Sequence, residues 1–345
     1  MRCCFARFIV AAITLIGLPL AAASQTADAF YAGKNVRILI GFDVGGQYGQ
    51  FARLASTHMR AHVPGNPTMT VQAMPGASGM TAMNYLIGPA PQDGTVLALV
   101  TLGVMQEGLL EPQSKFDPSR LQWIGRMQTV VQLGIAATAT GLRTLADAKA
   151  REYVAGGTGM NSLPTMNFRL LNEMAGTRFK IVAGYKGTAE MHLAMERGEI
   201  TAYNNAWDVV QERYLADVKS GRFALIFNNG LSRVPELAGV PYLADFARND
   251  VEKAFMKIYA SGTELGRSLV APAAIPKERL AILREAFAGM LRDPAFLADA
   301  NSQGIRLEPL GGVQVEAMAA DVLSVPKDTV VAAREFYARL LAGAK

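Results

Sequence analysis

Glycine-rich loops that follow apolar segments are the part of this sequence best suited to bind a ligand. The first loop spans residues 41–49, with Gly45 and Gly46 at its centre, and the second spans 75–79. A weaker third loop spans 157–162. Where such a loop opens a helix, its backbone N–H groups lie at the positive end of the helix dipole and bind an anion without a buried basic side chain. Several of them in one chain indicate a receptor for an anionic small molecule.

Other reactive side chains fit known catalytic and metal-binding patterns poorly. The first loop lacks G-x-G-x-x-G spacing, and the Walker lysine is missing. Ser78 would be a nucleophile, but Met80 stands where G-x-S-x-G requires its last glycine. His58 and His62 have the i,i+4 spacing of a zinc pair, yet no glutamate lies between them and no third ligand is evident. We therefore expect no catalytic residue, no metal and no cofactor. Tight structural turns and packing histidines are the alternative interpretations.

The elements around these loops predict an α/β fold with a hinge. Strands alternate with amphipathic helices almost throughout, which is typical of α/β layers with largely parallel sheets. Segments 121–125 and 130–137 are expected to carry the chain into a second lobe, and the strand 267–271 to return it to the first. Two crossings make a hinge with a cleft, where ligands commonly bind. The strands beside the three loops are expected at 36–40, 68–73 and 153–156, and the helices that follow them at 50–62, 80–86 and 163–174.

Two segments of the second lobe carry side chains suited to the wall of such a cleft. The turn 184–187 contains Tyr185 and Lys186, and the strand at 200–203 runs into Asn204-Asn205-Ala206-Trp207. Amides and an aromatic ring combine hydrogen bonding with an apolar surface, although a buried tryptophan is often only core. A solvent-facing turn is the alternative for the first segment.

The N-terminus has the form of a secretory signal. A basic start precedes an apolar run at 8–20, and two A-x-A sites follow. We expect a signal peptide within residues 1–29, cleaved after Ala23 or Ala29, and a periplasmic location. Both cysteines precede the apolar run, so the mature chain has none, which suits a periplasmic protein with a large core.

Charge and composition exclude little except nucleic acid. The chain has 34 basic and 29 acidic residues, and half of it is apolar. No long basic run or alternation of aromatic and basic residues is present, so a nucleic-acid partner is not expected. The roughly 315 residues that remain after cleavage suffice for two lobes. We expect a monomer.

The sequence resembles the substrate-binding proteins of the tripartite tricarboxylate transporter family, the TctC-like or Bug periplasmic receptors. The similarity runs essentially end to end in the mature chain. The matching stretches are Gly45-Gly46 with FARL at 51–54, HVPGNP at 62–67, MPGA at 74–77, NYL at 84–86, APQDGT at 90–95, GYKGT at 184–188, AMERGE at 194–199, GR at 266–267 and VAP at 270–272.

The resemblance implies a two-lobe periplasmic binding fold of type II-like form that closes on a carboxylate-bearing ligand. Lobe one is expected from 30–129 plus 262–345, and lobe two from 130–261. The expected ligand is a di-, tri- or aromatic carboxylic acid, and the expected partner is a membrane transporter to which the ligand is delivered. An extracytoplasmic sensor subunit that works with a sensor kinase is the main alternative, and a secreted hydrolase that uses the same cleft is a weaker one.

The resemblance also places the ligand site. Family members hold one carboxylate mainly through backbone groups and ordered water from two loops of the first lobe, while the second lobe selects the rest of the ligand. The matching lobe-one positions are Gly45, Gly46, Gln47, Tyr48, Ala77, Ser78 and Gly79, and the matching lobe-two positions are Thr158, Asn161, Ser162, Tyr185 and Asn205.

Three positions depart from the family pattern. Gly49 stands where an acidic residue is usual, Ala73 replaces an asparagine, and Gln47 replaces a third glycine. The first two remove polar groups beside the loops, and the third adds a side chain there. A less polar or aromatic acid therefore becomes a plausible ligand.

Overall fold

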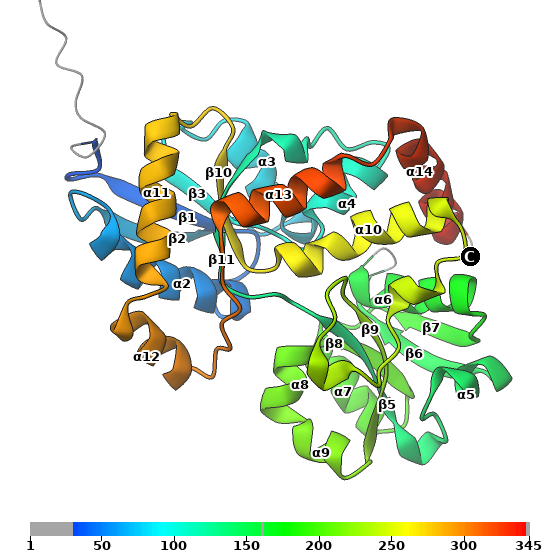
Figure 1. The fold of residues 1–345 in the computed structure, drawn as a ribbon. Coiled ribbons are helices and arrows are strands. Elements are labelled where there is room, and N and C mark those ends of the chain that lie inside the picture. The colour runs from blue at the N-terminus through cyan, green and yellow to red at the C-terminus, as the bar shows by residue number, and fades with distance from the viewer. Residues whose placement is uncertain (1–29, 160–161, 343–345) are drawn as a thin grey trace, which may run out of the picture.

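The computed structural model describes residues 30–159 and 162–342, so the expected signal peptide and Asn161 lie outside the described residues. Figure 1 shows two lobes, each built around one sheet with helices packed on it. The predicted crossings are confirmed, because the chain leaves the first sheet after β4 and returns to it at β10.

The first lobe contains a six-stranded sheet in the order β11-β4-β10-β3-β1-β2. Strand β1 pairs in parallel with β2 and β3, whereas β10 runs antiparallel to β3 and β4, and β11 runs antiparallel to β4. The strands are β1 Asn35–Ile40, β2 Thr68–Ala73, β3 Val96–Leu99, β4 Leu121–Arg126, β10 Ser268–Pro272 and β11 Leu310–Gly311.

The second lobe contains a five-stranded sheet in the order β7-β6-β8-β5-β9. Strand β6 is parallel to β7 and β8, and β5 is antiparallel to β8 and β9. The strands are β5 Gln132–Ala137, β6 Tyr153–Gly157, β7 Phe179–Ala183, β8 Ala202–Ala206 and β9 Phe223–Asn229. The predicted α/β two-lobe fold is confirmed, but both sheets are mixed rather than mainly parallel. The reason is that β5 and β10, which receive the chain at the two crossings, enter their sheets antiparallel to their neighbours.

Helices cover both sheets and flank the space between the lobes (Figure 1). In the first lobe they are α2 Gln47–Met59, α3 Met80–Ile87, α4 Val104–Leu110, α10 Asp250–Leu265, α11 Lys277–Met290, α12 Pro294–Ser302, α13 Gly312–Leu323 and α14 Lys327–Ala342. In the second lobe they are α5 Leu145–Ala150, α6 Leu163–Leu170 with a π turn at Leu171–Ala175, α7 Thr188–Glu196, α8 Trp207–Arg213 and α9 Leu215–Lys219. Short 3-10 turns occur at Arg60–His62, Ala77–Gly79, Pro118–Arg120, Thr138–Thr140, Pro235–Leu237 and Leu243–Phe246.

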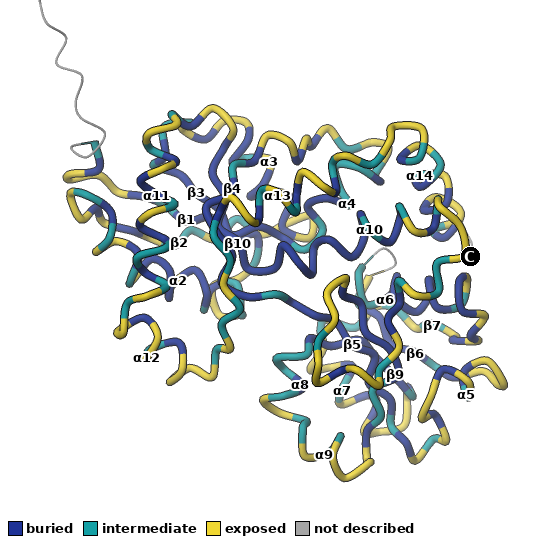
Figure 2. Tube along the Cα trace, in the orientation of Figure 1, coloured by how far each residue is buried: buried dark blue, intermediate teal, exposed yellow. Residues whose placement is uncertain are grey.

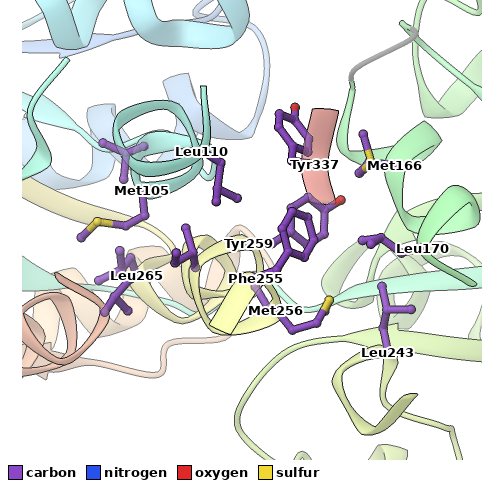
Figure 3. Close-up of a cluster of buried hydrophobic side chains, with 14 of the residues drawn as sticks. Met105, Leu110, Met166, Leu170, Leu243, Phe255, Met256, Tyr259, Leu265 and Tyr337 are labelled. Atoms are coloured by element: carbon purple, nitrogen blue, oxygen red, sulfur yellow. The ribbon is translucent and has the colours of Figure 1, made fainter. Parts of the chain in front are cut away.

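Helix α10 joins the cores of the two lobes. Figure 2 shows it as one of the most deeply buried helices, and Figure 3 shows its side chains Phe255 and Tyr259 among apolar residues of both lobes. Met105 and Leu110 of α4 lie on one side of it and Met166 of α6 on the other. Burial of apolar surface stabilises the folded state by about 25 cal/mol per Å² removed from water. This shared core fixes the α10 side of the junction between the lobes, so a ligand site must be sought on its other sides.

Candidate functional site

The first glycine loop ends in an uncapped helix. Gly46 is the N-cap of α2 and provides no side-chain cap, so the first N–H groups of this 13-residue helix are left for other partners. The helix starts at Gln47 rather than at the predicted Gln50. Gly49 explains this early start, because a Cβ atom there would lie 1.9 Å from the carbonyl oxygen of Val44. The absence of a side chain at 49 lets α2 begin directly against the loop.

The second loop adopts a conformation that is unusual for its residues. Gly76, Ala77, Ser78 and Gly79 have positive φ angles of 131°, 46°, 55° and 91° in succession. Ala77 and Ser78 have side chains, for which this left-handed region costs of order 1 kcal/mol or more each. Both are exposed. Such backbone conformations cluster at binding sites, where the surrounding structure holds them in place.

The two loops touch each other. A Cβ atom at Gly41 would lie 2.3 Å from the Cα atom of Gly79, so only glycines allow this approach. The aromatic rings of Phe42 and Tyr48 stack beside it, with centroids 4.4 Å apart. Two loops that are far apart in the sequence therefore form one surface of lobe one.

A buried arginine stands behind this surface. Arg267, which immediately precedes β10, is 3% exposed, and its guanidinium lies 4.2 Å from the centre of the Tyr48 ring. Its Nη2 atom donates to Oε1 of Gln47 at 2.9 Å. Its Nε and Nη1 atoms are buried without a hydrogen-bond partner. Among the described residues, no carboxylate forms an ion pair with Arg267.

Gln47 also contacts the second lobe. Its Nε2 atom donates to Oδ2 of Asp208, in the first turn of α8, at 2.9 Å. One side-chain amide therefore connects a buried cation of lobe one with a carboxylate of lobe two.

Two cavities lie between the lobes, and each is lined by residues of both lobes. The α4–α6 pocket has a volume of about 480 Å³ and is lined by Phe42, Tyr48, Ala77 and Ser78, by Gln106, Glu107 and Glu111 near α4, and by Gln132 and Ser162 from lobe two. The α2–α8 pocket has a volume of about 570 Å³ and is lined by Gly45, Gly46, Gln47 and Arg53, by Gln128, and by Thr188, Asp208 and Arg213 from lobe two. Both volumes suit a small organic ligand.

Buried amides hold the lobe-two wall of the α4–α6 pocket. Oε1 of Gln132 accepts a hydrogen bond from Asn204 at 2.6 Å, and Oδ1 of Asn204 accepts one from Asn167 at 2.6 Å. Oδ1 of Asn167 in turn accepts from Asn229 at 3.0 Å and from the hydroxyl of Tyr259 at 2.9 Å. Complete burial raises the pKa of Tyr259 well above its usual range, which keeps this hydroxyl a neutral donor. The network positions Gln132 at the pocket.

The structure divides the predicted site residues into three groups. Tyr48, Ala77, Ser78 and Ser162 line the α4–α6 pocket, and Gly45, Gly46 and Gln47 line the α2–α8 pocket. Gly79, Thr158, Tyr185 and Asn205 line neither of these two pockets.

Asn205 and Tyr185 have other contacts. The side chain of Asn205 is bonded to the Tyr203 hydroxyl and to the backbone N–H of Ala206. Its neighbour Asn204 reaches the amide network instead, because successive residues of a strand point to opposite faces. Tyr185 packs against an apolar cluster of lobe two, and burial raises the pKa of its hydroxyl.

Sequence reasoning did not identify Arg267, Asp208 or Gln132 as site residues. The position of Arg267 in the sequence does indicate burial, because it directly precedes the buried strand SLVAP and the chain enters the core there. No comparable signal exists for Asp208, whose contact with Gln47 depends on how the lobes meet.

The histidines have structural partners. His58 pairs with Asp299 at 2.9 Å and His62 with Asp293 at 3.1 Å, which docks α12 onto α2. His192 contacts the Tyr203 hydroxyl at 3.1 Å. None of these contacts involves Ser78. Within residues 30–159 and 162–342, no cluster of three or more histidine, cysteine or acidic side chains could hold a metal ion, and no helix is long and apolar enough to cross a membrane.

Solved structures with the same architecture identify the fold. A TctC solute-binding protein from Polaromonas, determined with no ligand, superposes with a TM-score of 0.65 at 18% identity over 91% of this chain and 99% of its own. The chain has a periplasmic binding protein fold. The periplasmic binding protein BugD matches with a TM-score of 0.59 at 20% identity, covering 90% of this chain and 98% of its own.

A third structure with this fold contains a ligand. Rpa4515 from R. palustris, solved with adipate, has a TM-score of 0.58 at 20% identity over 86% of this chain and 97% of its own. No protein-family model matches the sequence, and no curated protein matches it. The periplasmic binding protein fold of this chain thus rests on structure, with identities of 20% or less to the three proteins.

Proposed function

We propose that this chain is a periplasmic receptor of the TctC-like or Bug type, which captures a carboxylate-bearing small molecule between its lobes and delivers it to a tripartite tricarboxylate-type transporter. The observation that carries this proposal is the joined surface of the two glycine loops, which faces the second lobe across cavities of ligand size. The adipate bound to a protein of the same fold supports a carboxylate as the ligand class.

The energetics of such a site are sufficient for capture. A hydrogen bond to a charged group contributes about 1.5–3 kcal/mol. A dissociation constant of 1 μM requires about 8 kcal/mol, so a few such bonds together with exclusion of water suffice. Closure of the second lobe over the ligand would supply that exclusion and would create the surface that a membrane partner recognises.

A receptor fits the contacts of the site better than a hydrolase does. Ser78 has a left-handed backbone and is exposed, as a nucleophile would be, but each histidine of the chain is bonded to another partner. A serine nucleophile needs a base within hydrogen-bond reach. We therefore assign no chemical step to the cleft.

Two measurements test the proposal. Native mass spectrometry of the protein purified from its expression host, followed by denaturation, is expected to release one small carboxylic acid per chain. A thermal-shift panel of succinate, adipate, citrate and benzoate is expected to contain at least one acid that raises the Tm. A folded protein that releases no acid and is not stabilised by any member of the panel would contradict the receptor assignment.

The position of the site is tested separately. Ser78→Tyr should fill the α4–α6 pocket and weaken binding at least tenfold while the Tm without ligand changes little. Ser324→Tyr is the matched control, because Ser324 is exposed at the C-terminal end of α13, outside the residues that line either pocket. Equal affinity in the two variants would place the ligand outside this pocket.

A further inference from the structure

Arg267 has a combination of properties that a purely structural arginine lacks. Only 3% of its surface is exposed, and two of its three side-chain nitrogens, Nε and Nη1, have no hydrogen-bond partner among the described residues. No carboxylate of the described chain neutralises it. A buried charge costs several kcal/mol unless it is paired, and each unsatisfied buried donor adds to that cost.

The contacts that Arg267 does make offset only part of this cost. The face of Tyr48 at 4.2 Å supplies a cation–π interaction, and the ring of Phe51 lies further away at 5.6 Å. A desolvated cation–π contact offsets part of the cost of burying a cation but leaves its N–H groups unpaired. Within residues 30–159 and 162–342, the one side-chain hydrogen bond of Arg267 goes to a neutral amide, Oε1 of Gln47. The guanidinium therefore retains most of its capacity to bind an anion.

Gln47 occupies one of the two edges through which Arg267 could bind a carboxylate. A carboxylate binds a guanidinium through two parallel N–H···O bonds, which use either Nε with Nη2 or Nη1 with Nη2. Each pair uses one of the two N–H groups of Nη2, and Oε1 of Gln47 accepts a hydrogen bond from Nη2. The Nε and Nη1 atoms, which have no partner among the described residues, are the other halves of the two pairs. Removal of this amide oxygen would thus free the edge that it occupies.

The side chain of Gln47 has room to change its conformation. It lies in the first turn of α2 and lines the α2–α8 pocket, so its side chain borders open space. Its second bond crosses to Asp208 on the other lobe, at 2.9 Å. The uncapped N–H groups of α2 lie beside it, and they favour a negative charge at the same place.

We propose that Arg267 binds the carboxylate of the ligand, and that Gln47 occupies the position of that carboxylate until the ligand displaces it. This inference rests on the proposed receptor function and names the side chain that provides the charge. Gln47 is then a positioning residue: it satisfies Arg267 and holds Asp208 in the empty protein, and the ligand takes over the contact with Arg267.

The experiment compares charge variants along one helix by isothermal titration calorimetry. The probe is the acid of the succinate, adipate, citrate and benzoate panel that stabilises the wild-type protein most. Gln47→Glu places a carboxylate of almost the same shape against Arg267, loses the donation to Asp208 that Gln47→Ala also loses, and is expected to weaken binding about 100-fold or more. Gln47→Ala removes the competing amide and is expected to bind the probe at least as tightly as the wild-type protein does.

Gln50→Glu is the matched control. It adds the same charge to the same helix three residues further on, where the side chain also lines the α2–α8 pocket but is not bonded to Arg267, and is expected to weaken binding less than tenfold. Thermal melts without ligand establish that each variant is folded. Arg267→Lys keeps the charge but loses the bidentate edge, and should bind the probe at least tenfold more weakly.

The outcomes separate the two proposals. If the folded wild-type protein releases no acid in native mass spectrometry and binds no acid of the panel, the receptor function itself is overturned, and the role of Arg267 falls with it. If the wild-type protein binds an acid but Gln47→Glu binds it as well as Gln50→Glu does, the receptor function stands and the role of Arg267 is wrong.

Discussion

Asn167 is expected to be one of the most sensitive positions for stability outside the apolar core. It is fully buried, and its side chain makes three hydrogen bonds, with Asn204, Asn229 and Tyr259. Substitution by alanine removes all three. Tyr259 keeps an alternative acceptor, the carbonyl oxygen of Leu163 at 3.3 Å. Asn204 and Asn229 each lose their bond to Asn167, and among the described residues no other side chain takes its place.

The expected loss in the free energy of unfolding follows from the two side-chain amides, of Asn204 and Asn229, that lose a partner. A buried polar group without a partner costs about 1–3 kcal/mol, so Asn167→Ala should lower the free energy of unfolding by about 2–6 kcal/mol. Tyr259→Phe, which removes one of the three bonds and leaves Asn167 with the other two, should cost about 1 kcal/mol. Asn301→Ala, at an exposed position of α12, should change the free energy of unfolding by less than about 0.5 kcal/mol.

Chemical denaturation followed by tryptophan fluorescence measures these differences. The chain has two tryptophans, Trp123 in β4 of lobe one and Trp207 at the start of α8 in lobe two. Variants that lack one tryptophan or the other show which unfolding transition belongs to which lobe. A cost below about 1 kcal/mol for Asn167→Ala in the Trp207 signal would refute the reasoning, since the freed amides would then have found other partners.

Further predictions concern backbone sterics, pH and the pocket wall. Gly49→Ala should destabilise the protein by about 1–3 kcal/mol because its Cβ meets the backbone of Val44, whereas Gly45→Ala has open space and should be nearly neutral in the same denaturation assay. Burial lowers the pKa of His192, so the folded state resists its protonation. The stability that this provides is complete above the unfolded pKa of about 6.5 and is lost as the pH falls below it. The Tm should therefore drop more between pH 7.5 and pH 5 in the wild-type protein than in His192→Gln, and equal drops would contradict this. Gln132→Ala should weaken ligand binding in calorimetry, and an unchanged affinity would remove Gln132 from the site.

The fold and the loops could be predicted because their signals are local. Apolar periodicity and glycine positions lie within short segments, so the strands before both loops and the two crossings were readable from the sequence. Gly49 shows the limit of such reading. The sequence alone indicates a missing polar group at this position, whereas the structure shows that a side chain there would collide with Val44 at the start of α2.

The side-chain contacts of the site could not be predicted, because they join distant parts of the chain. Gln47, Asp208 and Arg267 meet only after both lobes have folded and docked. The placement of Asn204 against Asn205 depends on the register of one strand, where a shift of a single residue exchanges the two faces. The spacing of residue types does not encode docking, and the five residues of β8 are all buried, so no alternation of polar and apolar residues shows which asparagine faces the network.

The pairing of β5 with β9 has a consequence beyond binding. All five strands of the second sheet come from the continuous stretch 132–229, and its first and last strands lie side by side, with Gln132 opposite Asn229. Paired residues are about 5 Å apart, so the strands of this sheet form an insertion in the chain whose two ends nearly meet. The segment after β9 still belongs to the lobe, since Tyr242 pairs with Asn228 and Leu237 packs in its apolar core. An exchange of this lobe between proteins of the same fold would therefore have to include that segment. A fluorescent reporter inserted near Gln132 or Asn229, where the chain enters and leaves this sheet, would convert any movement between the lobes into an optical signal.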